Sequence, residues 1–153
     1  MDARGTVDAV EPQQHEWVNV RGGRLYTTSS GRGVPVVVCH GGPGSYDYLG
    51  AVAELLDGVA EVHRFDQRGG GRSQAGGPWE LAALVGDMEV LRRHWRHERW
   101  VVAGHSWGAH LALFYALAYP GRTLGGCFPQ RHRGPLGLGL GATRQPDAAA
   151  DAA

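Results

Sequence analysis

The 153-residue chain contains neither lysine nor isoleucine, so all fifteen of its basic residues are arginine. We attribute this bias to GC-rich coding DNA rather than to function. The formal net charge is +0, so nothing in the composition suggests the excess basic charge of a nucleic-acid or membrane-surface partner. We therefore expect neither kind of partner.

Cysteine is scarce and long hydrophobic runs are missing. The two cysteines, Cys39 and Cys127, form no C-x-x-C pair and no disulfide framework, which fits a reducing compartment. No apolar run reaches the length of a membrane span, and the N-terminus has no signal-peptide core. These absences predict a cytoplasmic protein, and the length suits one modest domain.

The most informative stretch that is present is Gly104-His105-Ser106-Trp107-Gly108. Residues 100–103 before it form a short apolar run typical of a buried strand in a parallel sheet. Residues 109–119 after it favour a helix and are apolar on most sides. A G-x-S-x-G sequence between a strand and a helix predicts a nucleophile elbow, in which flanking glycines hold a strained, exposed serine.

The rest of the chain predicts strands that alternate with helices, and hence an α/β fold with a mostly parallel sheet and flanking helices. Residues 1–14 lack periodicity and are expected to form a loose leader. Gly, Pro, Ala and Arg dominate residues 124–153, which predicts a disordered tail. The domain is therefore expected to span residues 15–123. Before the elbow strand, we expect strands at 15–20, 25–29, 36–39 and 61–65, and helices at 48–56 and from Pro78 to about Leu91.

Acyl transfer by a serine requires a nucleophile and hydrogen-bond donors for the oxyanion. Ser106 is the predicted nucleophile. The backbone N–H of Trp107, directly after it, is one predicted donor. The glycine-rich loop His40-Gly41-Gly42-Pro43-Gly44 follows an earlier strand, and we expect the Gly42 N–H to be the second donor. His40, Gly41 and His105 are candidates for lining the substrate pocket.

Three motifs together resemble the α/β-hydrolase superfamily, and within it the proline iminopeptidase-like branch. They are His40-Gly41-Gly42-Pro43-Gly44, Asp66-Gln67-Arg68-Gly69-x-Gly71-Arg72-Ser73 and Gly104-x-Ser106-Trp107-Gly108. The resemblance covers roughly residues 15–123. It implies the α/β-hydrolase fold, hydrolysis through an acyl-enzyme, and no cofactor. It also implies that residues 66–73 form a structural loop near the site.

Other chemistries have weaker support. The glycines around Gly70 lack the G-K-[ST] of a phosphate-binding loop, and no dinucleotide fingerprint follows a strand. His94 and His97 have helical spacing but lie among arginines, which indicates a solvated basic face rather than a metal site. We therefore predict no metal.

The base and acid of a triad are not assigned to any residue. In this superfamily the chain order is Ser, Asp/Glu, His. After Ser106 and its helix, the acids are Asp147 and Asp151 and the histidine is His132, in the wrong order and within the predicted tail. The chain therefore resembles the N-terminal half of the fold, truncated or frameshifted near Thr123, and is expected to be catalytically incomplete.

Three functional hypotheses follow. The first is a proline iminopeptidase-like hydrolase that cleaves an amide or ester in a small molecule or short peptide. The second is a general esterase or lactonase of the same fold, and the third is a non-catalytic remnant or binding module. Because no strand was expected beside residues 100–103, their unpaired edge also predicts self-association.

Overall fold

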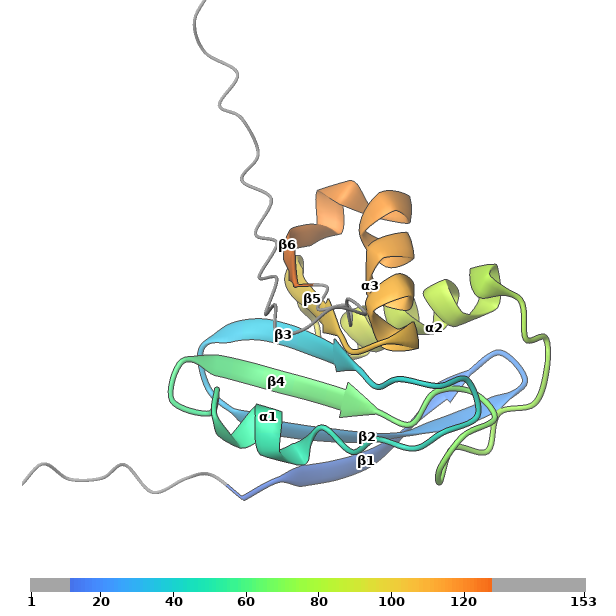
Figure 1. Cartoon of the computed structure of the whole chain (residues 1–153), viewed down its shortest axis with the longest axis horizontal. Coiled ribbons are helices and arrows are strands. Elements are labelled where there is room, and N and C mark those ends of the chain that lie inside the picture. Colours follow the sequence, from blue (N-terminus) through green and yellow to red (C-terminus); the bar gives the residue numbers. More distant parts are fainter. Residues whose placement is uncertain (1–11, 128–153) are drawn as a thin grey trace, which may run out of the picture.

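The computed structural model describes residues 12–127, in which six strands form one sheet with helices on both of its faces (Figure 1). This confirms the predicted α/β-hydrolase fold. The strands are β1 (Gln14–Val20), β2 (Gly23–Gly31), β3 (Val34–Cys39), β4 (Ala60–Phe65), β5 (Trp100–Gly104) and β6 (Thr123–Cys127). The helices are α1 (Gly50–Glu54), α2 (Leu81–His94), α3 (Trp107–Ala118) and the short 3-10 helix η1 (Pro120–Arg122).

The strand order in the sheet is β1-β2-β4-β3-β5-β6. The chain begins with an antiparallel hairpin, β1 and β2, and β2 also pairs antiparallel with β4. From β4 onward the neighbours are parallel, because each connection carries the chain back to the starting edge. The carboxyl ends of β3, β4 and β5 therefore meet at one edge of the sheet, which is where ligands bind in open α/β sheets.

Alternating side chains of the central strands build two hydrophobic cores. On one face, Val37 and Cys39 of β3 pack in the core formed with α2 and α3. On the other face, Val36 and Val38 pack in the core formed with α1. A strand that is buried on both faces has a continuous run of apolar residues. The sequence of β3 therefore predicts a strand.

The elbow strand β5 differs from the sequence-based expectation in one respect. β6 lies parallel to it, pairing Trp100 with Thr123 and Ala103 with Cys127. The elbow strand is therefore not at the edge of the sheet, and the expectation of an unpaired edge along residues 100–103 is wrong. The repeated glycines of β6 concealed it, because glycine is a poor strand former. Self-association stays a prediction.

The other boundaries lie close to those expected. β1 begins at Gln14, one residue before the predicted strand, while residues 1–11 lie outside the described part. The tail expected from residue 124 overlaps β6, and residues 128–153 again lie outside it. None of the helices described within residues 12–127 is long and apolar enough to cross a membrane.

Candidate active site at the nucleophile elbow

Ser106 occupies the strained turn that the sequence predicts between β5 and α3. Its backbone has φ 55° and ψ −118°, a combination that non-glycine residues rarely adopt. The residue is exposed, and it lies at the N-terminus of α3. The positive end of the helix dipole therefore points toward the position of the serine side chain.

The glycines on either side of Ser106 allow backbone segments to approach closely. A Cβ atom at Gly104 would lie 2.1 Å from the carbonyl oxygen of Gly108. A Cβ atom at Gly108 would lie 2.0 Å from the carbonyl oxygen of Cys39 and 2.5 Å from that of His40. These distances are shorter than any van der Waals contact, so both positions require glycine. The elbow is thereby held against the end of β3.

The glycine-rich loop after β3 lies directly beside the serine. A Cβ atom at Gly41 would be 3.1 Å from the Cβ atom of Ser106. Gly42 has φ 71°, a left-handed conformation that favours glycine. Within residues 12–127, the backbone N–H groups of Gly42 and Trp107 have no hydrogen-bond partner. Both predicted oxyanion donors are thus unpaired, with Trp107 directly after the serine and Gly42 directly after Gly41.

Tyr48 is a site residue that the sequence analysis missed. Its hydroxyl accepts a hydrogen bond from the Gly41 N–H at 2.9 Å and lies 2.7 Å from Nδ1 of His105. The tautomer of His105 decides which of the two atoms donates in the second contact. Tyr48 therefore connects the two loops that flank the serine. An aromatic residue shortly after a glycine loop gives little signal for this role in the sequence alone.

His40 holds the glycine loop in place from beneath rather than facing the solvent. The side chain is fully buried. Its Nε2 accepts the Gln67 N–H at 3.1 Å, so Nδ1 carries the proton that is donated to the Gly41 carbonyl at 2.9 Å. Gln67 also donates to the His40 carbonyl and accepts from the Trp107 indole. Gln67 therefore connects the glycine loop after β3, the loop after β4 and the nucleophile elbow.

The loop after β4, residues 66–73, is saturated with hydrogen bonds. The two carboxylate oxygens of Asp66 accept the N–H groups of Asp47 at 2.6 Å and Arg72 at 2.8 Å. Ser73 donates its hydroxyl to the Asp66 carbonyl and accepts the Tyr26 N–H. Asp66 is therefore fully occupied by the backbone around it, as expected of a structural residue.

Arg68 anchors the same loop to helix α2. Its guanidinium donates two hydrogen bonds to Asp87, at 3.0 Å and 2.7 Å, and both side chains are buried. Burial raises the pKa of the Asp87 carboxyl, although the hydrogen bonds from Arg68 act in the opposite direction. Desolvation thus outweighs the attraction in this pair.

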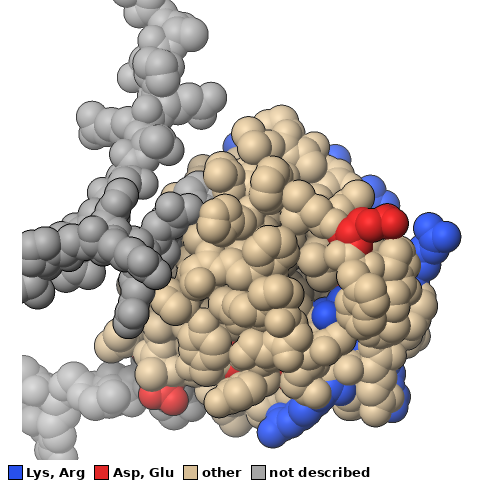
Figure 2. Space-filling model, turned by 45° about the vertical axis from the view of Figure 1, so that its right-hand side comes forward, with Lys and Arg blue, Asp and Glu red and all other residues tan. Residues whose placement is uncertain are grey.

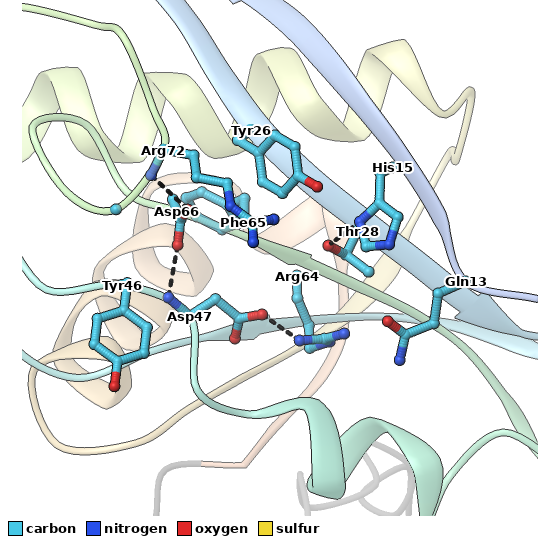
Figure 3. Close-up of a pocket in the computed structure, with 11 residues that line it drawn as sticks. Gln13, His15, Tyr26, Thr28, Tyr46, Asp47, Arg64, Phe65, Asp66 and Arg72 are labelled. Atoms are coloured by element: carbon cyan, nitrogen blue, oxygen red, sulfur yellow. Dashed lines mark hydrogen bonds and ion pairs between the residues drawn. The ribbon is translucent and has the colours of Figure 1, made fainter.

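A pocket of about 460 Å³ opens beside Asp66, on the α1 side of β4 (Figure 3). Figure 3 shows Asp47 between Asp66 and Arg64, with Arg72 near the Tyr26 ring. Ser106 is not among the residues that line it. This pocket is therefore lined by the supporting loop and its neighbours rather than by the elbow.

No catalytic base is paired with the serine in the described part of the chain. Both ring nitrogens of His40 and Nδ1 of His105 have hydrogen-bond partners other than Ser106. His132, Asp147 and Asp151 lie outside the described residues. Cys39 offers no alternative nucleophile, because complete burial raises the pKa of its thiol far above the usual range.

The two histidines expected on a solvated basic face have different surroundings. His94 is partly exposed and lies 2.9 Å from Glu16 of β1. His97 is mostly buried and its Nε2 lies 2.8 Å from Nε2 of His63. The interpretation as a solvated face therefore holds for His94 and is wrong for His97, because the chain turns inward after α2.

Comparison with known proteins places the chain among hydrolases. A protein named probable proline iminopeptidase from Streptomyces coelicolor is 39% identical over 123 residues, covering 73% of this chain and 38% of that protein. A proline iminopeptidase from Neisseria meningitidis is 38% identical, covering 67% and 34%. One from Arabidopsis thaliana is 37% identical, covering 66% and 28%. The chain therefore spans between 28% and 38% of these three relatives.

Solved structures agree on the fold. An epoxide hydrolase from an endophytic Streptomyces has a TM-score of 0.70 and 26% identity, covering 79% of this chain and 39% of that chain. An epoxide hydrolase from Vigna radiata also has a TM-score of 0.70, with 23% identity and coverage of 80% and 42%. The latter likeness concerns the fold alone.

The family match covers the part of the chain that builds the site. The sequence family described as alpha/beta hydrolase fold matches residues 34–125, from β3 through the glycine loop and the elbow into β6. Together with the strained serine between β5 and α3, this match leads to one conclusion. The chain belongs to the alpha/beta hydrolase fold family.

Proposed function

We propose that residues 12–127 provide the nucleophile and oxyanion donors of a serine hydrolase, with Ser106 attacking the carbonyl of a small amide or ester. The observation that carries the proposal is the elbow itself. Ser106 is exposed at φ 55°. The unpaired N–H of Trp107 directly follows it in the chain, and that of Gly42 belongs to the loop whose Gly41 lies beside the serine. Donors that are fixed before reaction stabilise a developing oxyanion most effectively.

The chemical step would follow the usual course of acyl transfer. The Ser106 hydroxyl would add to the substrate carbonyl carbon while a base accepts its proton, and the carbonyl oxygen would receive the two N–H groups. Collapse would expel the amine or alcohol and leave an acyl-enzyme, which water then hydrolyses. We place the base and the acid outside residues 12–127, because His40 and His105, the histidines of the two loops at the serine, have other hydrogen-bond partners.

The proposed substrate class is a small molecule or short peptide. Figure 2 brings forward the side of the molecule toward which the arrows of β3 and β4 point in Figure 1, and much of this face carries neither basic nor acidic side chains. Such a surface suits a compact, weakly charged substrate. Because three of the relatives named above are called proline iminopeptidases, a peptide or anilide with an N-terminal proline is the first substrate to test.

A chimera tests whether the elbow is competent. Residues 12–127 would replace the matching segment of the Streptomyces coelicolor relative, and hydrolysis of proline p-nitroanilide and p-nitrophenyl acetate would be measured. We expect activity that falls by a factor on the order of 10⁶ in Ser106→Ala. A folded chimera without activity, or activity that survives Ser106→Ala, would contradict the proposal.

The two substrates separate the competing functions. Preference for the anilide favours the iminopeptidase, whereas preference for the ester favours the esterase alternative. A matched pair of glycine variants tests the loop beside the serine. Gly41→Ala would place a methyl group 3.1 Å from the Ser106 Cβ atom and 2.5 Å from the Tyr48 hydroxyl, so we expect a large loss of activity. Gly76→Ala meets no atom within 4 Å and should leave the rates unchanged.

The chain on its own is expected to behave differently from the chimera. Without a base, the Ser106 hydroxyl is a weak nucleophile. We expect the purified chain to hydrolyse both substrates barely above buffer and to react slowly with a fluorophosphonate probe. A robust rate that Ser106→Ala abolishes would show that the chain contains its own base, and would overturn the expectation that the chain is catalytically incomplete.

A further inference from the structure

A cluster of three potential metal ligands lies far from the elbow in the topology of the sheet. Glu61 and His63 are two residues apart on β4, so their side chains emerge on the same face. His97 comes from the connection between α2 and β5. Their ligand atoms all lie within 4.8 Å of one another. Residue 97 precedes β5 and Ser106 follows it, so the cluster is toward the amino-terminal side of the parallel strands.

We propose that Glu61, His63 and His97 bind a divalent transition-metal ion, with Zn²⁺ as the best match. The two Nε2 atoms lie 2.8 Å apart, Oε1 of Glu61 lies 3.5 Å from Nε2 of His63, and Oε2 of Glu61 lies 3.8 Å from Nε2 of His97. Ligands about 2.0–2.2 Å from a tetrahedral zinc ion lie roughly 3.3–3.5 Å apart. Each of the three observed separations differs from this spacing by about half an ångström or less.

The hydrogen bonds within the cluster leave it incomplete without a cation. The two Nε2 atoms face each other at 2.8 Å, so a bond between them has one donor and one acceptor. The Glu61 oxygens lie 3.5 Å from His63 and 3.8 Å from His97, beyond hydrogen-bonding distance of both. A metal ion placed among Glu61, His63 and His97 would contact all three side chains. A proton shared between two of them would leave the third without a partner.

His63 is oriented as a metal ligand requires. Its Nδ1 lies 2.7 Å from the Ser29 hydroxyl, and its ring stacks on Trp95 at a centroid distance of 4.0 Å. The Ser29 hydroxyl can accept a hydrogen bond from Nδ1, and in that tautomer His63 presents a lone pair at Nε2, a pattern common in zinc sites. With 1% of its side chain exposed, His63 has little freedom to turn away.

The charge and accessibility of the site also suit a cation. The nearby Arg92 is neutralised by two hydrogen bonds to Glu89. The Glu61 side chain is 40% exposed, which leaves solvent access for a water molecule as the fourth ligand.

The proposed site is structural rather than catalytic. It would tie β4 to the segment that leads into β5, two elements 34 residues apart in the sequence. A ligand that binds only the folded state raises its stability in proportion to the logarithm of the ion concentration. The site is independent of the function proposed for Ser106.

The test uses the full chain, without a histidine tag and freed of metal by a chelator. Zn²⁺ would be titrated by calorimetry, and Co²⁺ would be added to record the visible absorption of tetrahedral coordination. We expect one ion per chain and a melting temperature raised by roughly 5 °C or more in excess Zn²⁺. No binding, or no change in melting temperature, would overturn the proposal.

Variants locate the site. His97→Gln and Glu61→Gln change partly accessible side chains, and each should weaken Zn²⁺ binding more than about tenfold and abolish the thermal shift. His94→Gln is the matched control, because His94 also faces a glutamate, Glu16 at 2.9 Å, but belongs to no cluster of three ligands in the described part. Equal binding in all three variants would refute the assignment.

Discussion

The nucleophile elbow and the loop after β4 lie at the same edge of the sheet but use their polar groups in opposite ways. In the elbow, Ser106 has a strained backbone, and the N–H groups of Trp107 and of Gly42 in the adjoining glycine loop are unpaired. In the loop, Asp66 accepts two backbone N–H groups and Arg68 makes a paired contact with Asp87. The elbow therefore keeps backbone N–H groups without hydrogen-bond partners, whereas the polar side-chain groups of Asp66 and Arg68 in the loop after β4 all have partners.

This difference indicates how a small fold can hold a strained serine. Local strain persists only where surrounding structure fixes the conformation. Here Gln67 of the loop contacts both His40 beneath the glycine loop and the indole of Trp107 in the elbow. The loop therefore stabilises the geometry that the elbow requires. Disrupting the loop should destabilise the fold, and relaxing the elbow should stabilise it.

The largest expected effect is the loss of the loop's anchor. Arg68→Met would leave the Asp87 carboxylate buried without a partner, and breaking a buried ion pair in this way costs about 3–5 kcal/mol. Urea denaturation near pH 7 would measure the change in the free energy of unfolding. The double variant Arg68→Met/Asp87→Leu should recover most of it, because desolvation already raises the pKa of Asp87. A single variant as stable as the original chain would contradict this account of the loop.

The helix that follows the elbow depends on a carboxylate and therefore on pH. Glu89 of α2 accepts hydrogen bonds from Arg92, Arg93 and the hydroxyl of Tyr115 on α3. Hydrogen bonds from Arg92 above all lower the pKa of Glu89 from 4.5 to about 2. This stabilisation is present above pH 4.5, and is lost as the pH falls toward 2. The loss is on the order of 3 kcal/mol.

Stability curves between pH 5 and pH 2 would measure the contribution of Glu89. In Glu89→Gln this part of the acid dependence should disappear, because the amide does not titrate. Glu98→Gln is the control, since Glu98 is 86% exposed and lies 4.0 Å from Arg122. If Glu89→Gln and the unchanged chain lose stability in parallel on acidification, the low pKa of Glu89 is wrong.

Two glycines test the close packing of the elbow against β3. Gly108→Ala would place a methyl carbon 2.0 Å from the Cys39 carbonyl oxygen, and we expect a loss of about 1–3 kcal/mol or more from overpacking. Gly86→Ala, in helix α2, meets no atom within 4 Å and should gain about 0.5–1 kcal/mol. Thermal melts of both variants would reveal whether the two changes differ in sign.

Much of this site could be predicted from the sequence because its parts are local. A few neighbouring residues are enough to predict each part. The apolar runs predict the strands β3 and β5, and the glycines around Ser106 predict the tight turn. β6 escaped prediction, because its glycines form a strand only through pairing with β5. The contacts of Tyr48 with His105 and of His63 with His97 are equally non-local, joining residues 57 and 34 positions apart.

The smallest expected effect concerns the strain at Ser106 itself. A non-glycine residue in a left-handed conformation costs roughly 1–2 kcal/mol, and at φ 55° Ser106 carries such a cost. Ser106→Gly removes the Cβ atom and should raise the free energy of unfolding by about 1 kcal/mol relative to Ser106→Ala, which keeps it. Urea denaturation of the two variants side by side isolates the strain, because both lack the hydroxyl. If the alanine variant is equally stable or more stable, the elbow stores no strain and the contrast with the loop rests on hydrogen bonding alone.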